Sequence, residues 1–362
     1  MIKTEYYKDL TKMNTFGMKV KARCFVEYDS VADLVDIEFE ELSRPVLHIG
    51  GGSNLLFTDD FKGTVLHSKI SFIEVLNESS CHPEAVLVSV GAGVVFDDFC
   101  GWAAKEGLWG VENLSYIPGE VGASAVQNIG AYGVEVKDVI RAVYCYDTRE
   151  EEFVKFDVED CCYGYRDSLF KRPDVKGRYI VTHVVFELSR EPRPQLGYGH
   201  LRDAVMAAVG GMSQGTSAAD TNDPRITPAM VRKVIIKIRK EKLPEPSVMG
   251  SAGSFFKNPV IPAEQYQKIE AVAKAELGAD YKVPHYDLPD DMVKVPAAWM
   301  IEQCGWKGRR SGGAAVYEKQ PLVIVNYTGE AYPEEIISLE RRIISSVKEK
   351  FGVELHPEVD HI

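Results

Sequence analysis

Two glycine-rich stretches constrain the fold of this chain more than any other feature of its sequence. The first reads Gly50-Gly51-Gly52-Ser53-Asn54 and follows Pro45 to Ile49, a short apolar run that predicts a buried strand. The second, Ile117 to Val136, is too interrupted for a regular element and too apolar for a disordered linker, so we expect a packed loop. Backbone N–H groups in such loops can bind phosphate oxygens. Taken alone, three glycines are more often a plain tight turn, so both interpretations stay open at this point.

Common nucleotide-binding and nucleophile motifs fail when tested against their contexts. The pattern G-x-G-x-x-G started at Gly50 would require glycine where Leu55 stands, and no run completes G-x-x-x-x-G-K-[ST]. These failures argue against a Rossmann cofactor site and a P-loop. Gly211 to Gly215 match G-x-S-x-G, but Ser213 lies in a small, polar segment with no apolar strand entering it. We therefore interpret that match as chance.

Composition predicts a folded protein of two or three domains. The chain has 362 residues, of which 45% are hydrophobic and 27% are charged. Its 54 acidic and 42 basic residues give a net charge of −12, the wrong sign for gripping nucleic acid or anionic lipid through a broad basic surface. Neither a signal peptide nor an apolar run of about 18 residues is found, so we expect no export by that route and no membrane span.

Cysteine and histidine usage predicts a reducing compartment and no metal. The seven cysteines form no CxxC pair, and the eight histidines form no cluster with metal-ligand spacing. We therefore expect reduced thiols in a cytoplasm and neither a structural nor a catalytic metal ion.

Hydrophobic patterns predict a mixed α+β chain. Strands are expected at 45–49, 86–90, 139–146 and 179–188, with a helix from about Val95 that stops before Gly107. Small and polar residues at 207–224 mark a domain edge. Thr227-Pro228 should begin an amphipathic helix, and a second is expected at 333–350. The last residues, 353–362, are expected to form a strand.

Four charged or hydroxyl side chains are candidates for chemistry. The planar fork of Arg166 suits a carboxylate substrate, although spacing alone favours a surface pair with Asp167. Ser254 could donate a proton or cap a turn, and Lys242 could bind a phosphate or begin a linker. Glu358, taken singly, is the least informative.

Seven segments, taken in order, resemble the UDP-N-acetylenolpyruvoylglucosamine reductase family, flavoenzymes that complete UDP-N-acetylmuramate for bacterial cell-wall peptidoglycan synthesis. The resemblance covers almost the whole chain. The segments are NTFG (14–17), GGGSNLLF (50–57), ENLSYIPGEVGASAVQNIGAYGVE (112–135), YGYRDS (163–168), KLPEP (242–246), GSAGSFFKNP (250–259) and HPEV (356–359).

The resemblance implies an FAD-binding pair of α+β subdomains, of the kind found in vanillyl-alcohol-oxidase-like flavoproteins, and a separate α/β substrate-binding domain. We expect the first subdomain at 1–70, with 353–362 returning to it, the second at 71–225, and the substrate domain at 226–352. FAD would be bound non-covalently by both glycine-rich stretches. The residues implied in cofactor binding are Gly50, Gly51, Gly52, Ser53, Asn54, Leu55, Pro118, Gly119, Gly122, Ala123, Ser124, Asn128, Gly130, Ala131, Tyr132 and Gly133.

The resemblance also implies the reaction and its catalytic residues. NADPH reduces FAD, and the reduced flavin delivers hydride to the enolpyruvyl group of the UDP-sugar substrate. Arg166 and a protonated Glu358 would stabilise the negative charge that develops, and Ser254 would protonate the adjacent carbon.

Substrate contacts follow from the same resemblance. Tyr198 lies in the tyrosine-bearing loop, residues 195–199, that one type of the family closes over the substrate, and Tyr165 would help hold the substrate. Lys242, Asn258 and Gln303 align with positions that contact the UDP part.

Two departures and two alternatives stand beside this resemblance. The segment 203–224 is longer than the usual connection, and the chain ends soon after Glu358. A flavin-dependent oxidase on the same fold would explain the glycine-rich stretches, and a flavin- or nucleotide-binding protein without turnover would share the fold. The sequence gives neither the oligomeric state, although it is compatible with a monomer, nor the preference for NADPH over NADH.

Overall fold

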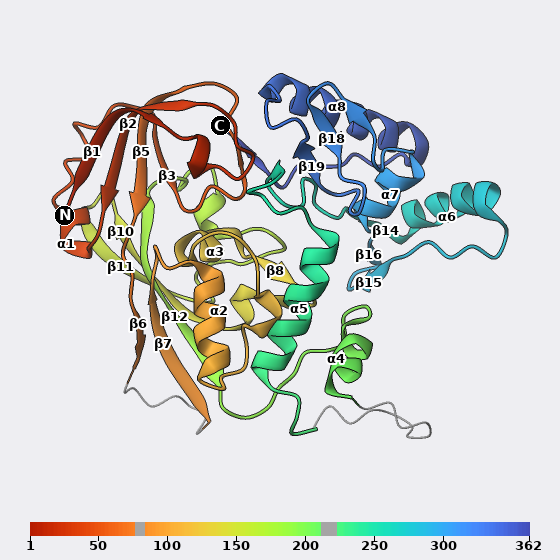
Figure 1. The fold of residues 1–362 in the computed structure, drawn as a ribbon, viewed down its shortest axis with the longest axis horizontal. Helices are drawn as coiled ribbons and strands as arrows, with labels where there is room; N and C mark the ends of the chain where they lie inside the picture. Colours follow the sequence, from red (N-terminus) through yellow and green to blue (C-terminus); the bar gives the residue numbers. More distant parts are fainter. Residues whose placement is uncertain (77–83, 211–222) are drawn as a thin grey trace. The chain divides into compact units, whose positions relative to one another are not determined.

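The computed structural model describes residues 1–76, 84–210 and 223–362, which divide into two compact units (Figure 1). Both units contain helices and strands, so the α+β expectation is confirmed. Unit 1 consists of Met1–Lys8, Ala22–Gly51 and Phe61–Glu241. Unit 2 consists of Asp9–Lys21, Gly52–Asp60 and Lys242–Ile362. The three-part division expected from the sequence stays a prediction.

A four-stranded sheet in unit 1 leads into the first glycine-rich stretch. Its order is β1 (Lys3–Asp9), β2 (Lys21–Tyr28), β5 (Phe61–Ser68) and β3 (Val46–Ile49). Both β2 and β3 run parallel to β5, so Gly50 begins where β3 ends at the carboxyl edge of the sheet. The strand predicted at 45–49 is confirmed. Helix α1 (Val31–Val35) is capped by Ser30, whose Oγ accepts a hydrogen bond from the Asp33 N–H at 3.1 Å.

A five-stranded sheet forms the centre of unit 1, and all its neighbouring strands are antiparallel. It confirms the strands predicted at 86–90, 139–146 and 179–188. Its order is β11 (Glu152–Asp157), β10 (Ile140–Asp147), β12 (Tyr179–Ser189), β7 (Ala85–Gly91) and β6 (Ile73–Val75).

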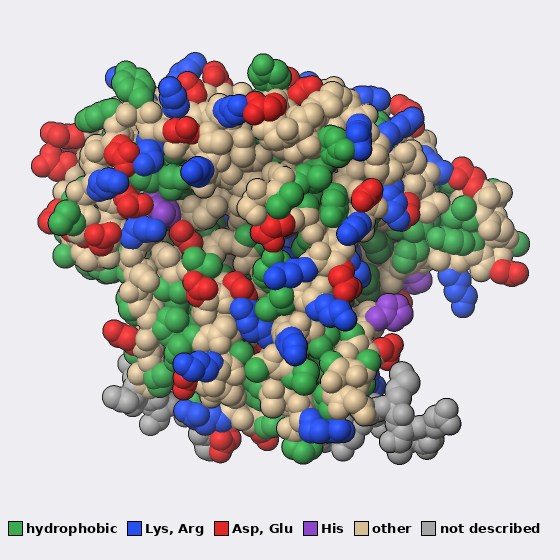
Figure 2. Space-filling model, in the orientation of Figure 1, with side chains coloured by type: hydrophobic (Ala, Val, Ile, Leu, Met, Phe, Trp, Pro, Cys, Tyr) green, Lys and Arg blue, Asp and Glu red, His purple; other side chains and the backbone are tan. Residues whose placement is uncertain are grey.

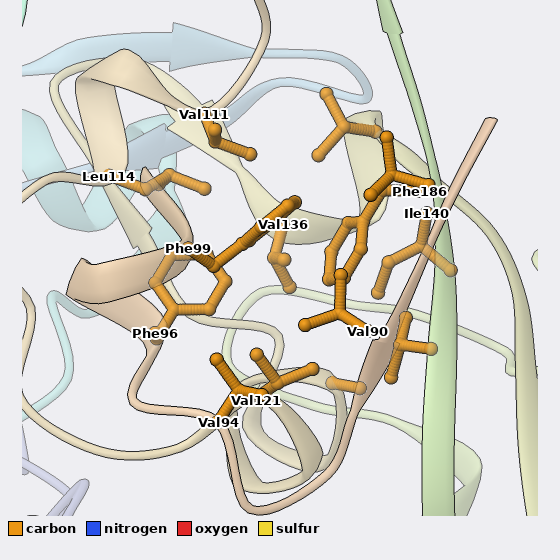
Figure 3. Close-up of a cluster of buried hydrophobic side chains, with 14 of the residues drawn as sticks. Val90, Val94, Phe96, Phe99, Val111, Leu114, Val121, Val136, Ile140 and Phe186 are labelled. Carbon is orange, nitrogen blue, oxygen red and sulfur yellow. The ribbon is translucent and has the colours of Figure 1, made fainter. Parts of the chain in front are cut away.

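The main core of unit 1 lies between this sheet and two helices, α2 (Phe96–Lys105) and α3 (Val121–Gln127). Figure 3 shows Val90 and Phe186 of the sheet close to Phe99 of α2, all at most 1% exposed. The helix predicted from about Val95 is confirmed. Short connecting elements complete this part: η2 (Glu112–Leu114), β8 (Gly130–Ala131), β9 (Val134–Glu135), η3 (Val136–Asp138) and η4 (Leu169–Lys171).

The expectation of a packed loop at 117–136 is wrong, because the stretch contains α3 and the β8–β9 hairpin. Val121 and Ala125 are fully buried on α3. A Cβ added at Gly122 would lie 2.9 Å from the Ala92 Cβ, so the missing side chain lets the helix approach the segment after β7. Tertiary packing, rather than helix propensity, therefore sets this helix.

Two further helices of unit 1 enclose a small second core. They are α4 (Leu201–Val209) and α5 (Pro228–Lys242), which pack with Trp109 through Leu201, Val205, Val231 and Ile235. The helix expected after Thr227-Pro228 is thus confirmed, but it belongs to unit 1, whereas the sequence assigned it to the substrate domain. Ser213 and most of the polar insertion lie outside the described residues.

Unit 2 is built on α8 (Pro333–Phe351), whose buried face packs on β18 and β19 and confirms the helix predicted at 333–350. The four-stranded sheet has the order β13 (Gly250–Ser251), β19 (Ile324–Asn326), β18 (Ala314–Val316) and β17 (Arg310–Ser311). Unit 2 also contains η1 (Thr11–Met13), β14 (Val260–Pro262), α6 (Ala263–Leu277), β15 (Tyr286–Leu288), β16 (Met292–Lys294) and α7 (Ala297–Gln303).

The strand expected at 353–362 is shorter than predicted. Only β20 (Asp360–His361) forms a regular strand there, and it runs parallel to β4 (Leu55–Leu56) within unit 2. The residues before it make a single antiparallel bridge, Phe256 to Pro357, and the Phe255 N–H that could extend this ladder donates instead to the Leu322 carbonyl oxygen at 2.8 Å.

The surface is mixed in charge. Figure 2 shows acidic and basic side chains interspersed over the face it displays. Within the described ranges, no helix has both the length and the apolar character needed to cross a bilayer.

Candidate functional site

The two glycine-rich stretches meet within unit 1. A Cβ added at Gly51 would lie 3.3 Å from the Gly119 Cα, and one added at Gly50 would lie 3.0 Å from the Ala123 Cβ. Gly51, Pro118 and Ala123 are exposed. The turn after β3 therefore faces the entry to α3 at backbone distance, and side chains at the two glycines would occupy the space between them.

The rest of the first stretch belongs to unit 2. Gly52 has a φ of +61°, and a Cβ there would lie 1.9 Å from the Met13 carbonyl oxygen, so only glycine fits. The Asn54 side-chain amide donates to the Glu358 carbonyl oxygen at 3.0 Å, while the Asn54 carbonyl oxygen accepts from the Asp360 N–H at 3.0 Å. Asn54 thus fixes the segment that carries Glu358, next to Leu55 in β4.

Two polar side chains of the second stretch point into the protein. Asn128 is fully buried in a left-handed conformation, and its amide nitrogen donates to the Gly164 carbonyl oxygen at 2.7 Å. The Ser124 hydroxyl donates to the Val121 carbonyl oxygen at 2.7 Å. Both side chains hold the shape of the stretch, so any contact they make with a cofactor would come from their backbone.

Arg166 is held against the same stretch. Its guanidinium donates to the carbonyl oxygens of Gly130 at 2.6 Å and Asn128 at 3.3 Å, and it lies 5.4 Å from the centroid of the Tyr165 ring. A Cβ at Gly130 would lie 2.8 Å from its Nη1. The structure therefore brings together Arg166, Tyr165 and the second glycine-rich stretch. These contacts support a functional position more than a surface pair with Asp167.

The tyrosine-bearing loop lies over the β8–β9 turn. The Tyr198 side chain is 43% exposed, and its ring meets that of Tyr132 edge to face, with centroids 6.2 Å apart. Next to Tyr132, a Cβ at Gly133 would come within 3.4 Å of the Tyr198 Cβ. Ala131 is in β8 of this hairpin.

Sequence reasoning missed Asn113, which joins these two features. The residue is fully buried, and its side-chain amide donates to the carbonyl oxygens of Gln195 at 2.7 Å and Tyr132 at 3.0 Å. The signal was available, because Asn113 stands beside Val111 and Leu114, and a buried asparagine must either cap a turn or satisfy buried backbone groups.

Ser254 and Glu358 lie on adjacent segments of unit 2. The Glu358 N–H donates to the Phe255 carbonyl oxygen at 2.8 Å, and the Lys257 N–H donates to the His356 carbonyl oxygen at 2.9 Å. Phe255 and Phe256 are buried, at 1% exposure each, whereas Ser254 and Glu358 are partly exposed. Two buried aromatic residues therefore fix Ser254 and Glu358 on neighbouring backbone segments.

The three residues expected at the UDP part are spread along unit 2. The Asn258 Oδ1 accepts from the N–H of Ala297, the first residue of α7, at 2.9 Å, and Gln303 is the last residue of that helix. Lys242 is exposed at the end of α5. At about 1.5 Å per residue, α7 separates Asn258 from Gln303 by roughly 9 Å of helix axis, so the two do not form one compact cluster.

The predicted site residues thus fall in two groups. Unit 1 holds Gly50, Gly51, the second glycine-rich stretch, Tyr165, Arg166 and Tyr198. Unit 2 holds Gly52, Ser53, Asn54, Leu55, Lys242, Ser254, Asn258, Gln303 and Glu358.

Comparisons with known proteins match segments of both units. A family model described as "UDP-N-acetylenolpyruvoylglucosamine reductase, C-terminal domain" matches residues 245–362, and one described as "FAD binding domain" matches residues 22–156. A solved structure of UDP-N-acetylenolpyruvylglucosamine reductase from Thermus caldophilus is similar in fold, with a TM-score of 0.64 at 22% identity, covering 100% of this chain and 98% of that one.

Curated relatives match over nearly the full length. The UDP-N-acetylenolpyruvoylglucosamine reductase of Bacteroides fragilis is 48% identical over 355 residues, which is 98% of this chain and 98% of the relative. That of Porphyromonas gingivalis is 43% identical over 358 residues, 98% of this chain and 97% of the relative. On this full-length similarity, the chain belongs to the UDP-N-acetylenolpyruvoylglucosamine reductase family.

Proposed function

We propose that this protein uses NADPH and bound FAD to reduce the enolpyruvyl group of UDP-N-acetylglucosamine enolpyruvate to UDP-N-acetylmuramate, a step of peptidoglycan synthesis. The observation that carries the proposal is the position of Arg166. Its guanidinium bonds the Gly130 carbonyl oxygen at 2.6 Å, which sets a permanent cation beside the stretch expected to hold the flavin. A substrate carboxylate is the natural partner for such a cation.

The residues of unit 1 fit FAD. Gly51 and Gly119 approach each other at backbone distance, and Gly51 and Ala123 are exposed, so backbone groups on both sides are accessible to a diphosphate. When bound and reduced by NADPH, FAD supplies the hydride that the carbon–carbon double bond of the substrate must accept.

Three residues would serve the reaction. Hydride addition to the methylene carbon of the enolpyruvyl group leaves negative charge on the adjacent carbon, spread into the carboxylate. Arg166 would stabilise that charge, and Glu358 would assist it in its protonated form. The Ser254 hydroxyl would give its proton to the adjacent carbon, which completes the saturated ether.

The remaining residues would bind the UDP-sugar. Lys242 supplies a cation, and Asn258 and Gln303 supply amide groups, for the UDP part. Tyr198 would pack on the substrate, because its ring is exposed on the loop that already contacts Tyr132. A reducing cytoplasm belongs to the same proposal, since Cys24, Cys100, Cys145, Cys161, Cys162 and Cys304 are free.

Anaerobic stopped-flow absorbance near 450 nm tests this proposal. The purified yellow protein is reduced with NADPH and then mixed with UDP-N-acetylglucosamine enolpyruvate. We expect prompt reoxidation of the flavin with formation of UDP-N-acetylmuramate. A flavin that stays reduced until oxygen is admitted would support an oxidase instead, and a colourless protein would exclude both flavin enzymes.

A further inference from the structure

A buried histidine connects the core of unit 1 to the junction of the two glycine-rich stretches. His67 lies on β5 and is 5% exposed. Its Nδ1 is 3.0 Å from a carboxylate oxygen of Glu27 on β2, and its Nε2 is 3.0 Å from a carboxylate oxygen of Glu120, just before α3. A neutral imidazole has one N–H, so only the imidazolium can donate to both carboxylates.

The other groups around His67 are aromatic or neutral. His48, on the adjacent strand β3, has its pKa lowered to about 4 by burial and by the His67 charge, and its Nε2 lies 2.8 Å from the Tyr28 hydroxyl. The Phe25 ring lies 6.1 Å from the His67 ring, centroid to centroid. The two charged groups that face His67 in the described part of unit 1 are therefore Glu27 and Glu120.

The charge state of His67 follows from opposing effects. Burial alone would lower its pKa, but the hydrogen bond and the charge of Glu120, followed by those of Glu27, outweigh burial and raise its pKa above the ordinary value. The imidazolium thus persists at pH values where a solvent-exposed histidine is neutral.

Glu120 connects the charge of His67 to the two glycine-rich stretches. It follows Gly119, which faces Gly51, and its second carboxylate oxygen lies 3.2 Å from the position that a Gly50 Cβ would take. A carboxylate at this junction repels a diphosphate. With His67 protonated, the three side chains carry a net charge of −1 rather than −2, and the Glu120 carboxylate is held toward the imidazole.

We infer that His67 is a positioning residue for the cofactor: as an imidazolium between Glu27 and Glu120, it restrains and partly neutralises Glu120, so that the glycine-rich loops bind the diphosphate of FAD more tightly. The inference rests on the proposed function, because it takes those loops to be the FAD site. FAD affinity is then highest at pH values below the raised pKa of His67 and falls as the pH rises through it.

Titration of the full-length apoprotein with FAD, followed by quenching of flavin fluorescence from pH 5.5 to 9, tests the inference without turnover. We expect the wild-type Kd to rise about five- to tenfold across this range. His67→Gln should show the weak, high-pH affinity throughout. Glu120→Gln should bind tightly with a nearly flat pH profile.

The double variant His67→Gln/Glu120→Gln separates charge from packing. If His67 acts on Glu120, the double variant binds FAD as tightly as Glu120→Gln alone. Equal losses from His67→Gln in both backgrounds would overturn the inference, because His67 would then act through packing.

Glu27→Gln is the matched control, because it removes the carboxylate on the side of the ring away from the loops. This variant should keep the tight FAD affinity at low pH, and the midpoint of its plot of FAD affinity against pH should move to lower pH. It also tests the inference if His67→Gln does not fold, since an unmoved midpoint would overturn it. Wild-type protein that binds no FAD at any pH would instead remove the proposed function.

Discussion

Arg166 combines an unfavourable backbone conformation with the hydrogen bonds that position its side chain. Its φ is +54°, in the left-handed region, which costs a residue with a side chain about 1–2 kcal/mol. The turn around it is closed by two backbone bonds between Gly164 and Asp167, at 3.0 and 3.1 Å. The surrounding structure therefore holds Arg166 in a conformation that directs its guanidinium to Gly130.

Replacement of Arg166 by lysine keeps the positive charge and tests whether the planar guanidinium group is required. Lysine cannot bond two carbonyl oxygens and a carboxylate in one plane, so we expect substrate reduction to slow by about 10²- to 10³-fold. Stopped-flow rates of the two half-reactions measure this, with flavin content as a check on the loop. Arg141→Lys, at an exposed position on β10, is the control. An unchanged rate of substrate reduction in Arg166→Lys would contradict the assigned role.

Glu358→Gln should separate the two half-reactions. We expect this variant to keep its flavin and its reduction by NADPH, because the backbone bonds of residue 358 to Phe255 and Asn54 do not involve the carboxyl group. Reduction of the enolpyruvyl substrate should be slower, as it should be for Ser254→Ala. Glu354→Gln, exposed and paired with Lys348, serves as the matched control. Wild-type turnover in Glu358→Gln would remove the carboxyl group from the mechanism.

At the scale of elements, the three consecutive glycines of the first glycine-rich stretch have different structural roles. Gly50 and Gly51 leave room beside Ala123 and Gly119, whereas Gly52 makes the turn itself possible against Met13. A single run of glycines thus permits two different close backbone approaches, one to the entry of α3 and one to Met13.

Gly52→Ala should be far more damaging than Gly17→Ala. Both glycines have positive φ, of 61° and 67°, so each alanine costs about 1 kcal/mol in backbone strain. At Gly17 the added Cβ meets no described heavy atom within 4 Å, but at Gly52 it would lie 1.9 Å from a backbone oxygen. We expect a further loss of about 3 kcal/mol at Gly52. Urea-unfolding midpoints measure the difference, and equal midpoints would show that the Met13 segment moves freely.

Regular periodicity explains which elements the sequence predicted. Helices α5 and α8 and strands β3, β7, β10 and β12 carry apolar residues at helical or alternating spacing and were predicted. Helix α3 was missed because its glycine and alanine residues give no apolar stripe, and its burial depends on the contact between Gly122 and Ala92.

From the sequence alone, the candidate site could be predicted only as a set of separate motifs. The sequence grouped Arg166 with the glycine-rich stretch through the family resemblance, and its bonds to Gly130 and Asn128 required coordinates. His67 could not be found from the sequence, because the carboxylates that face it are 40 and 53 residues away along the chain.

At the scale of the whole molecule, the chain passes between the units five times, after residues 8, 21, 51, 60 and 241. Unit 2 therefore depends on two early segments. Asn326 donates a side-chain hydrogen bond to the Phe16 carbonyl oxygen at 3.1 Å, and β20 pairs with β4.

Residues 242–362 expressed alone should not reach the native structure of unit 2. The fragment lacks Asp9–Lys21 and Gly52–Asp60, so Asn326 and β20 lose their partners and apolar surface is uncovered. We expect helical circular dichroism with poor dispersion of amide proton signals in NMR. A well-dispersed spectrum would show that the early segments are dispensable.

The pairing of β4 with β20 also determines how late this part of unit 2 can form during synthesis on the ribosome. Thr58 bonds the carbonyl oxygen of Ile362 at a separation of 304 residues, and Asn54 bonds Glu358 at the same separation. At a synthesis rate of about 5–20 residues per second, roughly 15–60 seconds pass between the synthesis of β4 and that of β20. During that interval Leu56 and Phe57, which are fully buried in the folded protein, have not yet reached their native positions. A nascent chain that contains residues 52–60 but not yet residues 360–362 therefore exposes a short apolar segment, the kind of surface that makes incompletely folded chains prone to aggregation.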